Sequence, residues 1–173
     1  MAATITVNST EDSNIRNASL TLREAILVAN GTLNLPTLTA AEQAQINGTI
    51  GTGADRDTIA FNIGAIGSQQ LIQPLSALPP ISDPVIIDGL SQGGANYNGL
   101  PLVELSGNLP GFGMIGLDIT AGNSTVSHTN SDANSHRNAN SDRNYYRNSG
   151  RNFDTNSNSD RNYGRNSDRR LPV

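Results

Sequence analysis

The apolar residues of this chain are concentrated in its first 127 residues. Isoleucine, leucine, valine and phenylalanine occur 36 times in residues 1–127 and three times in residues 128–173. Ordering the backbone costs roughly 1–2 kcal/mol per residue, and a segment with so few apolar side chains cannot offset that cost by burial. We therefore expect one folded module over residues 1–127 and a disordered, low-complexity tail over residues 128–173.

The tail is built from short words of asparagine, serine, aspartate and arginine. The word Asn-Ser-Asp-Arg occurs at 140–143, 158–161 and 166–169, and an expanded repeat or a frame slip near residue 127 is a second hypothesis for its origin. Eight arginines and five aspartates give the tail a formal charge of +3, whereas the first 127 residues carry −7. Because the aspartates interrupt the arginines, we do not expect nucleic-acid binding, which depends on neutralising phosphates.

Composition excludes several other classes. Cysteine is absent, which excludes a disulfide framework, a thiolate metal site and a cysteine nucleophile. No stretch approaches the roughly 18 apolar residues of a membrane-spanning helix, so none is expected. The first seven residues show neither the basic nor the apolar region of a signal peptide. Both histidines, His128 and His136, fall in the tail, so we expect no Ser-His-Asp triad and no histidine metal site.

Residues 21–31 carry the start and stop signals of a short helix. Thr21 is followed three residues later by Glu24, the spacing of a capping box in which side chain and backbone bond reciprocally. Gly31 supplies a left-handed terminator. The residues between them form one apolar stripe at helical spacing, which consists of Leu22, Ala25, Ile26 and Ala29.

From residue 58 onward the chain shows short apolar runs separated by Gly, Pro, Asn or Asp. The runs are 58–63, 70–73, 85–88, 102–105 and 116–120. No strong helical segment separates them, so repeated strand-helix-strand units are not expected. The pattern alone leaves two arrangements open: antiparallel strands in a sandwich, or parallel strands stacked as a solenoid.

Residues 20–26, with the sequence LTLREAI, resemble the CSLREA motif. Three companion motifs follow in order, DTIAF at 57–61, LSALPPI at 75–81 and VIIDG at 85–89. Over roughly residues 4–126 the chain is thus similar to the N-terminal module of bacterial surface and secreted right-handed parallel β-helix proteins. It departs from that family at Leu20, where the family has cysteine.

The resemblance implies an all-β fold, a short right-handed parallel β-helix with an N-terminal capping α-helix, at the front of a longer protein. The cap would be formed by Thr21, Leu22, Glu24, Ile26 and Gly31. It also implies a non-enzymatic, adhesin-like structural module located on the cell surface or outside the cell. Its partner would be a surface polysaccharide or a host or cell-surface ligand. The alternative is a polysaccharide-binding or carbohydrate-active lyase or hydrolase, because parallel β-helices include such enzymes.

The carboxylates are the remaining candidates for a site. Asp55 and Asp57 flank Arg56, and two carboxylates at this spacing are weak candidates for Ca²⁺, which we interpret instead as a solvated turn. The other strand-associated carboxylates are expected to point outward, because an unpaired buried carboxylate is costly. They are Asp83, Asp88, Glu104 and Asp118. The sequence therefore assigns no catalytic or cofactor-binding residue.

Overall fold

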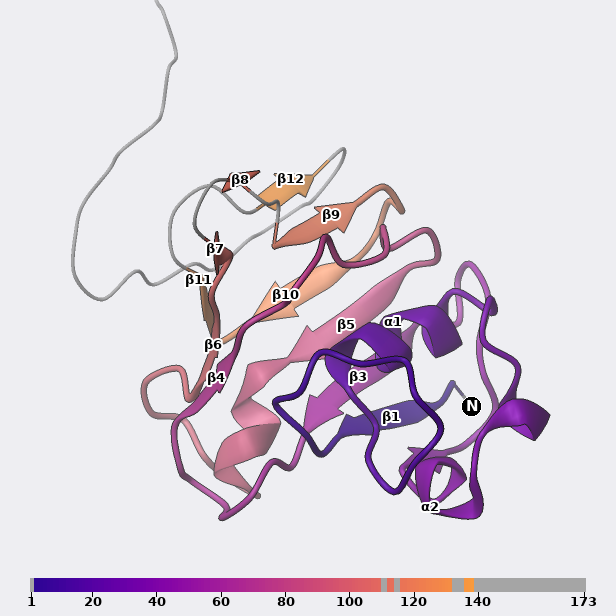
Figure 1. Cartoon of the computed structure of the whole chain (residues 1–173), viewed down its shortest axis with the longest axis horizontal. Coiled ribbons are helices and arrows are strands. Elements are labelled where there is room, and N and C mark those ends of the chain that lie inside the picture. The colour runs from indigo at the N-terminus through magenta and orange to yellow at the C-terminus, as the bar shows by residue number, and fades with distance from the viewer. Residues whose placement is uncertain (1, 110–111, 114–115, 132–135, 139–173) are drawn as a thin grey trace, which may run out of the picture.

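The computed structural model describes residues 2–109, 112–113, 116–131 and 136–138, which form short strands and a few helices (Figure 1). The helices are α1 (Leu22–Ala29) and α2 (Ala40–Gln43), and the 3-10 helices are η1 (Leu35–Thr37) and η2 (Gly89–Gly93). The strands are β1 (Thr4–Val7), β2 (Ile46–Asn47), β3 (Asp57–Phe61), β4 (Gln70–Ile72), β5 (Val85–Asp88), β6 (Val103–Leu105), β7 (Asn108–Leu109), β8 (Phe112–Gly113), β9 (Leu117–Ile119), β10 (Thr125–Ser127), β11 (Thr129–Ser131) and β12 (His136–Asn138).

The largest sheet in the described residues has five strands in the order β10-β5-β3-β1-β2. β1, β3, β5 and β10 run parallel, whereas β2 pairs antiparallel with β1, so the sheet is mixed. The smaller sheets β11-β6-β4 and β12-β9 are parallel, and β7-β8 is antiparallel. In Figure 1, β1, β3, β5 and β10 lie side by side, with α2 at the end near the N-terminus.

The prediction of an all-β, right-handed parallel β-helix is wrong. The described residues form a mixed sheet of short strands together with α1, α2 and two 3-10 helices. The prediction came from the family resemblance and from the apolar runs after residue 58. It therefore overlooked α2 and β2, which lack such runs, and the antiparallel pairing of β1 with β2 and of β7 with β8.

The core is a ladder of aliphatic side chains in register across the parallel strands. Ile5 of β1 pairs with Ile59 of β3, and Ile59 pairs with Ile87 of β5. Val126 of β10 is the next partner in this row, and all four side chains are buried. The apolar stripe of α1 belongs to the same buried cluster, and the helix contacts β1 and β3. Burial of this ladder fixes the strand register, because a slip of one residue would turn every side chain to the opposite face.

Two strands lie inside the segment that we expected to be disordered. β11 pairs with β6 and β12 pairs with β9, so residues 129–131 and 136–138 are exceptions to that expectation. In the second pair, Arg137 is the register partner of Asp118. Residues 139–173 lie outside the described residues, and the division of the chain at residue 127 stays a prediction.

Candidate functional site

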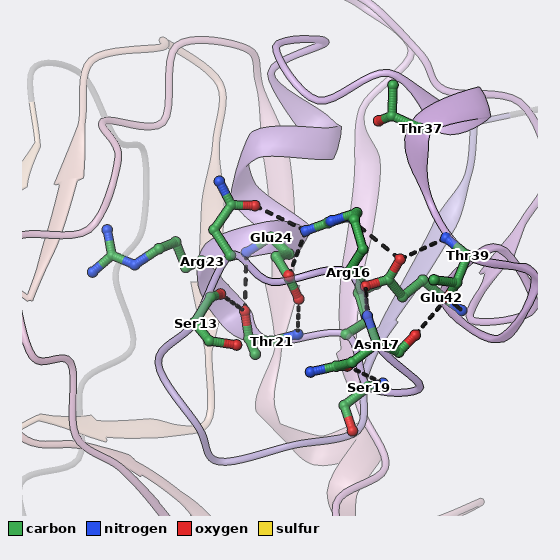
Figure 2. A network of polar contacts seen from close by, with 12 residues as sticks. Ser13, Arg16, Asn17, Ser19, Thr21, Arg23, Glu24, Thr37, Thr39 and Glu42 are labelled. Carbon is green, nitrogen blue, oxygen red and sulfur yellow. Dashed lines mark hydrogen bonds and ion pairs between the residues drawn. The ribbon is translucent and has the colours of Figure 1, made fainter.

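A polar cluster surrounds the N-termini of α1 and α2 (Figure 2). At α1, Thr21 Oγ1 accepts a hydrogen bond from the Glu24 amide at 3.2 Å, and Glu24 Oε2 accepts one from the Thr21 amide at 2.9 Å. This reciprocal pair is the capping box that the sequence predicts. After the helix, Gly31 has a φ of +68°, the left-handed conformation expected of a terminator.

A second capping box begins α2. Thr39 Oγ1 accepts from the Glu42 amide at 3.2 Å, and Glu42 Oε2 accepts from the Thr39 amide at 2.7 Å. The Thr-x-x-Glu spacing is the same as in α1, so this signal was present in the sequence. It was missed because a single helical turn containing two exposed alanines has no apolar stripe.

Arg16 joins the two capping boxes. Its guanidinium contacts Glu24 through Nη2 and lies 3.5 Å from Glu42 Oε2 through Nη1, as Figure 2 shows. Both carboxylate side chains are fully buried, whereas the Arg16 side chain is 27% exposed. One cation therefore compensates two carboxylates from two different helices. The cluster brings these carboxylates together although they are 18 residues apart in sequence.

The cluster also fixes the loop over residues 8–20, which has no regular structure of its own. The Asn17 amide donates to Glu42 Oε1 at 3.0 Å, and Thr39 Oγ1 donates to the Asn17 carbonyl. At the other helix, Thr21 Oγ1 donates to the Ser13 carbonyl at 2.8 Å. Each N-cap threonine therefore both caps its helix and anchors the loop.

The surroundings shift the pKa values of the two buried glutamates, Glu24 and Glu42, in opposite directions. Burial raises the pKa of Glu24, and the Thr21 hydrogen bonds and the Arg16 charge offset this only in part. Burial also acts on Glu42, but hydrogen bonds from the Asn17 and Thr39 amides outweigh it and lower the pKa of Glu42. A carboxylate with a lowered pKa stabilises the fold above its unfolded pKa, whereas a raised pKa has the opposite sign.

We expect stability to fall in acid through Glu42 and to be partly maintained by Glu24. As the pH falls, protonation of Glu24 relieves its penalty first, above the ordinary glutamate value of 4.5, whereas protonation of Glu42 removes its stabilising contribution below that value. Glu42→Gln should therefore flatten the loss of stability below about pH 4.5, and Glu24→Gln should remove the gain in stability that protonation of Glu24 gives just above about pH 4.5. Urea unfolding at a series of pH values measures both slopes. Equal slopes in the two variants would contradict this assignment.

A second ion pair links α1 to the loop over residues 8–20, and the same arginine also bonds to the segment after β4. Arg23 Nε and Nη2 donate to the two oxygens of Asp12 at 2.7 and 2.9 Å. The same guanidinium donates to the carbonyls of Ala77 and Ser76, both at 2.9 Å. Asp12 also accepts from the Leu75 amide at 2.7 Å, and although burial acts against it, these hydrogen bonds and the Arg23 charge lower the pKa of Asp12. Two of the sequence motifs, at 20–26 and 75–81, are thus joined by one arginine.

The two Ca²⁺ candidates, Asp55 and Asp57, differ in their surroundings. Asp57 is 1% exposed at the start of β3, where its Oδ1 accepts from the Ala3 amide at 2.8 Å and from the Gly51 amide at 2.9 Å. Its interpretation as a solvated turn residue is therefore wrong, whereas Asp55 is exposed. Within residues 2–109, 112–113, 116–131 and 136–138, no group of three or more His, Asp or Glu residues is arranged to hold a metal ion.

The other predicted carboxylates differ in their surroundings. Asp83 accepts from the Gly53 amide at 2.8 Å, and Asp88 accepts from the Leu90 amide at 3.0 Å, where it caps η2. Glu104 is exposed and Asp118 is half-buried. His128 lies at the corner between β10 and β11 with a φ of +52°, while the side chain of His136 lies outside the described residues.

Comparison with protein-family models, with curated protein sequences and with solved structures finds no match to this chain. In the part of the chain that the structure describes, no helix combines the length and apolar character needed to cross a bilayer. The polar cluster around α1 and α2 is therefore interpreted from its own geometry.

Proposed function

We propose that this chain is a non-enzymatic structural module of a cell-surface or secreted protein, with an adhesin-like role toward a surface polysaccharide or a cell-surface ligand. The supporting observation is that the charged residues of the segment 20–26 are used internally. Arg23 is held by Asp12 and by two backbone carbonyls, and Glu24 is fully buried in the capping box. Because the Arg23 guanidinium and the Glu24 carboxylate both bond within the chain, the motif acts to position the backbone and not to contact a substrate.

The arrangement of the carboxylates supports the same proposal. Acid and base pairs that cleave glycosidic bonds face one another across a substrate at a separation of about 5–10 Å. Here Asp57 and Asp83 accept hydrogen bonds from two amides of one loop, those of Gly51 and Gly53, and Asp88 accepts one from the Leu90 amide in η2. These bonds give each aspartate a structural role.

Cell fractionation tests the location that the proposal requires. Antibodies against the folded chain should label intact cells that express the whole gene, or should detect the protein in the medium. Added protease should remove the label from intact cells. Detection only after lysis would contradict a surface or secreted location.

A binding assay with a turnover readout tests the non-enzymatic role. The protein is incubated with immobilised acidic polysaccharides, and both retention and release of reducing ends are measured. The proposal expects retention without product. Product release by the natural sequence that is lost in Asp55→Ala or Asp88→Ala would instead favour a carbohydrate-active enzyme.

A further inference from the structure

Three asparagines are followed by glycine, at positions 30–31, 47–48 and 98–99. This pair permits a self-reaction in which the deprotonated glycine amide nitrogen attacks the asparagine Cγ. A new N–Cγ bond forms, the Cγ–Nδ2 bond breaks, and ammonia leaves as the succinimide closes. Water then opens the ring to aspartate or isoaspartate. The reaction needs an asparagine side chain and a glycine amide that are both free to move, so the fold decides which pair reacts.

The first pair is immobilised on both sides of the reacting bond. Asn30 Nδ2 donates to the Pro80 carbonyl at 2.8 Å, and Asn30 Oδ1 accepts from the Ser82 amide at 2.9 Å. The nucleophile is also engaged, because the Gly31 amide donates to the Val28 carbonyl at 2.9 Å. Reaction here requires these bonds to open first.

The second pair lies in the mixed sheet. Asn47 belongs to β2 and is the antiparallel partner of Thr4 in β1, which holds its backbone extended. Gly48 is exposed but lies close to the N-terminal segment, since a Cβ built on it would lie 2.9 Å from the Ala2 carbonyl oxygen. The strand must fray before Gly48 can turn toward the Asn47 side chain.

The third pair differs from both in its hydrogen bonding and not in its packing, since a Cβ on Gly99 would meet Tyr97 at least as closely as one on Gly48 would meet Ala2. Asn98 and Gly99 are exposed and lie outside the helices and strands, in the turn that follows η2. Within the described residues, the Asn98 side chain and the Gly99 amide make no hydrogen bond that would hold them apart. We propose that Asn98 is a self-modification site, converted through a succinimide with Gly99 to aspartate and isoaspartate in the folded protein.

The modification would alter a defined local contact. Tyr97 Oη donates to the Leu100 carbonyl at 2.7 Å, and its ring covers Gly99, where a built Cβ would lie 2.6 Å from the hydroxyl. Isoaspartate adds one main-chain atom between Tyr97 and Leu100 and leaves a carboxylate in the turn. The product therefore changes both the charge and the geometry of an exposed turn that ends in the exposed side chain of Leu100.

Tryptic digestion can test this proposal, because the chain contains no lysine and trypsin therefore cleaves it only after arginine. Trypsin releases residues 57–137, in which 98–99 is the sole Asn-Gly pair, separately from residues 24–56, which carry the other two. The folded protein is aged at mildly alkaline pH beside a sample unfolded in urea. Mass spectrometry with fragmentation then locates aspartate and isoaspartate at each position.

In the folded sample, we expect Asn98 to react within about threefold of its unfolded rate, and Asn30 to be slowed at least about tenfold, because several hydrogen bonds must open first. Asn98→Gln is the matched control, since a glutamine must close a larger ring, and it should remove the conversion in 57–137 without changing that of 24–56. Protection of Asn98 equal to that of Asn30 would overturn the proposal. Conversion of Asn47 before Asn98 in the folded sample would overturn it as well.

Discussion

Replacing Arg16 with alanine is expected to lower the free energy of unfolding by about 3–5 kcal/mol. The change leaves Glu24 and Glu42 fully buried without their shared cation, and unpaired buried charge is among the most costly defects in a fold. It also removes the guanidinium that joins the loop over residues 8–20 to both helices. Denaturant unfolding followed by circular dichroism measures the loss.

Further variants can distinguish whether Arg16→Ala loses stability through the missing charge or through the missing side-chain packing. Combining Arg16→Ala with Glu24→Gln removes one buried charge and should recover part of the stability, whereas Glu24→Gln alone should change stability little at neutral pH, because the neutral amide still caps α1 and relieves the penalty of the buried carboxylate. Arg16→Lys keeps the charge but presents a compact ammonium, which cannot reach both carboxylates as a planar fork does. Additive effects in the double variant would show that Arg16 acts through packing and not through charge.

Features that depend on neighbouring residues were predictable. The capping box at Thr21 and Glu24 needs only a spacing of three, and the aliphatic runs mark β3, β4, β5, β6 and β9 because burial in a sheet requires them. Even so, a local signal can be overlooked when no apolar stripe supports it. The box at Thr39 and Glu42 is the example.

Features that depend on distant residues were not predictable. Arg16 meets Glu42 across 26 residues of sequence, and no period or motif marks it as the link between two helices. Asp57 is buried because the Ala3 amide, 54 residues away, requires an acceptor. A single sequence shows that both side chains are charged but not which backbone groups surround them.

The prediction of a parallel β-helix was wrong for a related reason, because it too depended on contacts between distant residues. Apolar runs show where strands lie, but the direction of pairing depends on turns and on segments without a strong pattern. β2 has two residues and β7 and β8 have two each, yet they introduce the antiparallel pairs. The resemblance to the CSLREA-type modules implied an all-parallel β-helix, whereas these short segments pair antiparallel.

Asp57 joins β3 to the N-terminal segment, 54 residues away, and to the loop just before β3. Its carboxylate belongs to β3, and it accepts from the amide of Ala3 just before β1 and from Gly51 in the preceding loop. Gly51 has no room for a side chain, since a built Cβ would lie 1.8 Å from the Asp55 carbonyl oxygen. The loop therefore approaches Asp57 closely enough for its backbone amide to donate a hydrogen bond to the carboxylate.

Asp57→Ala is expected to cost about 2–6 kcal/mol of unfolding free energy, because it leaves two amides without an acceptor at about 1–3 kcal/mol each. Asp55→Ala is the matched control, and as an exposed substitution it should change stability by no more than about 0.5 kcal/mol. Asp57→Asn keeps an oxygen acceptor and should retain most of the stability. Thermal unfolding with and without added Ca²⁺ separates the two roles of this residue. A backbone acceptor predicts the same midpoint in both conditions, whereas a calcium-dependent rise that vanishes in Asp57→Ala would make it a metal ligand and contradict the structural assignment.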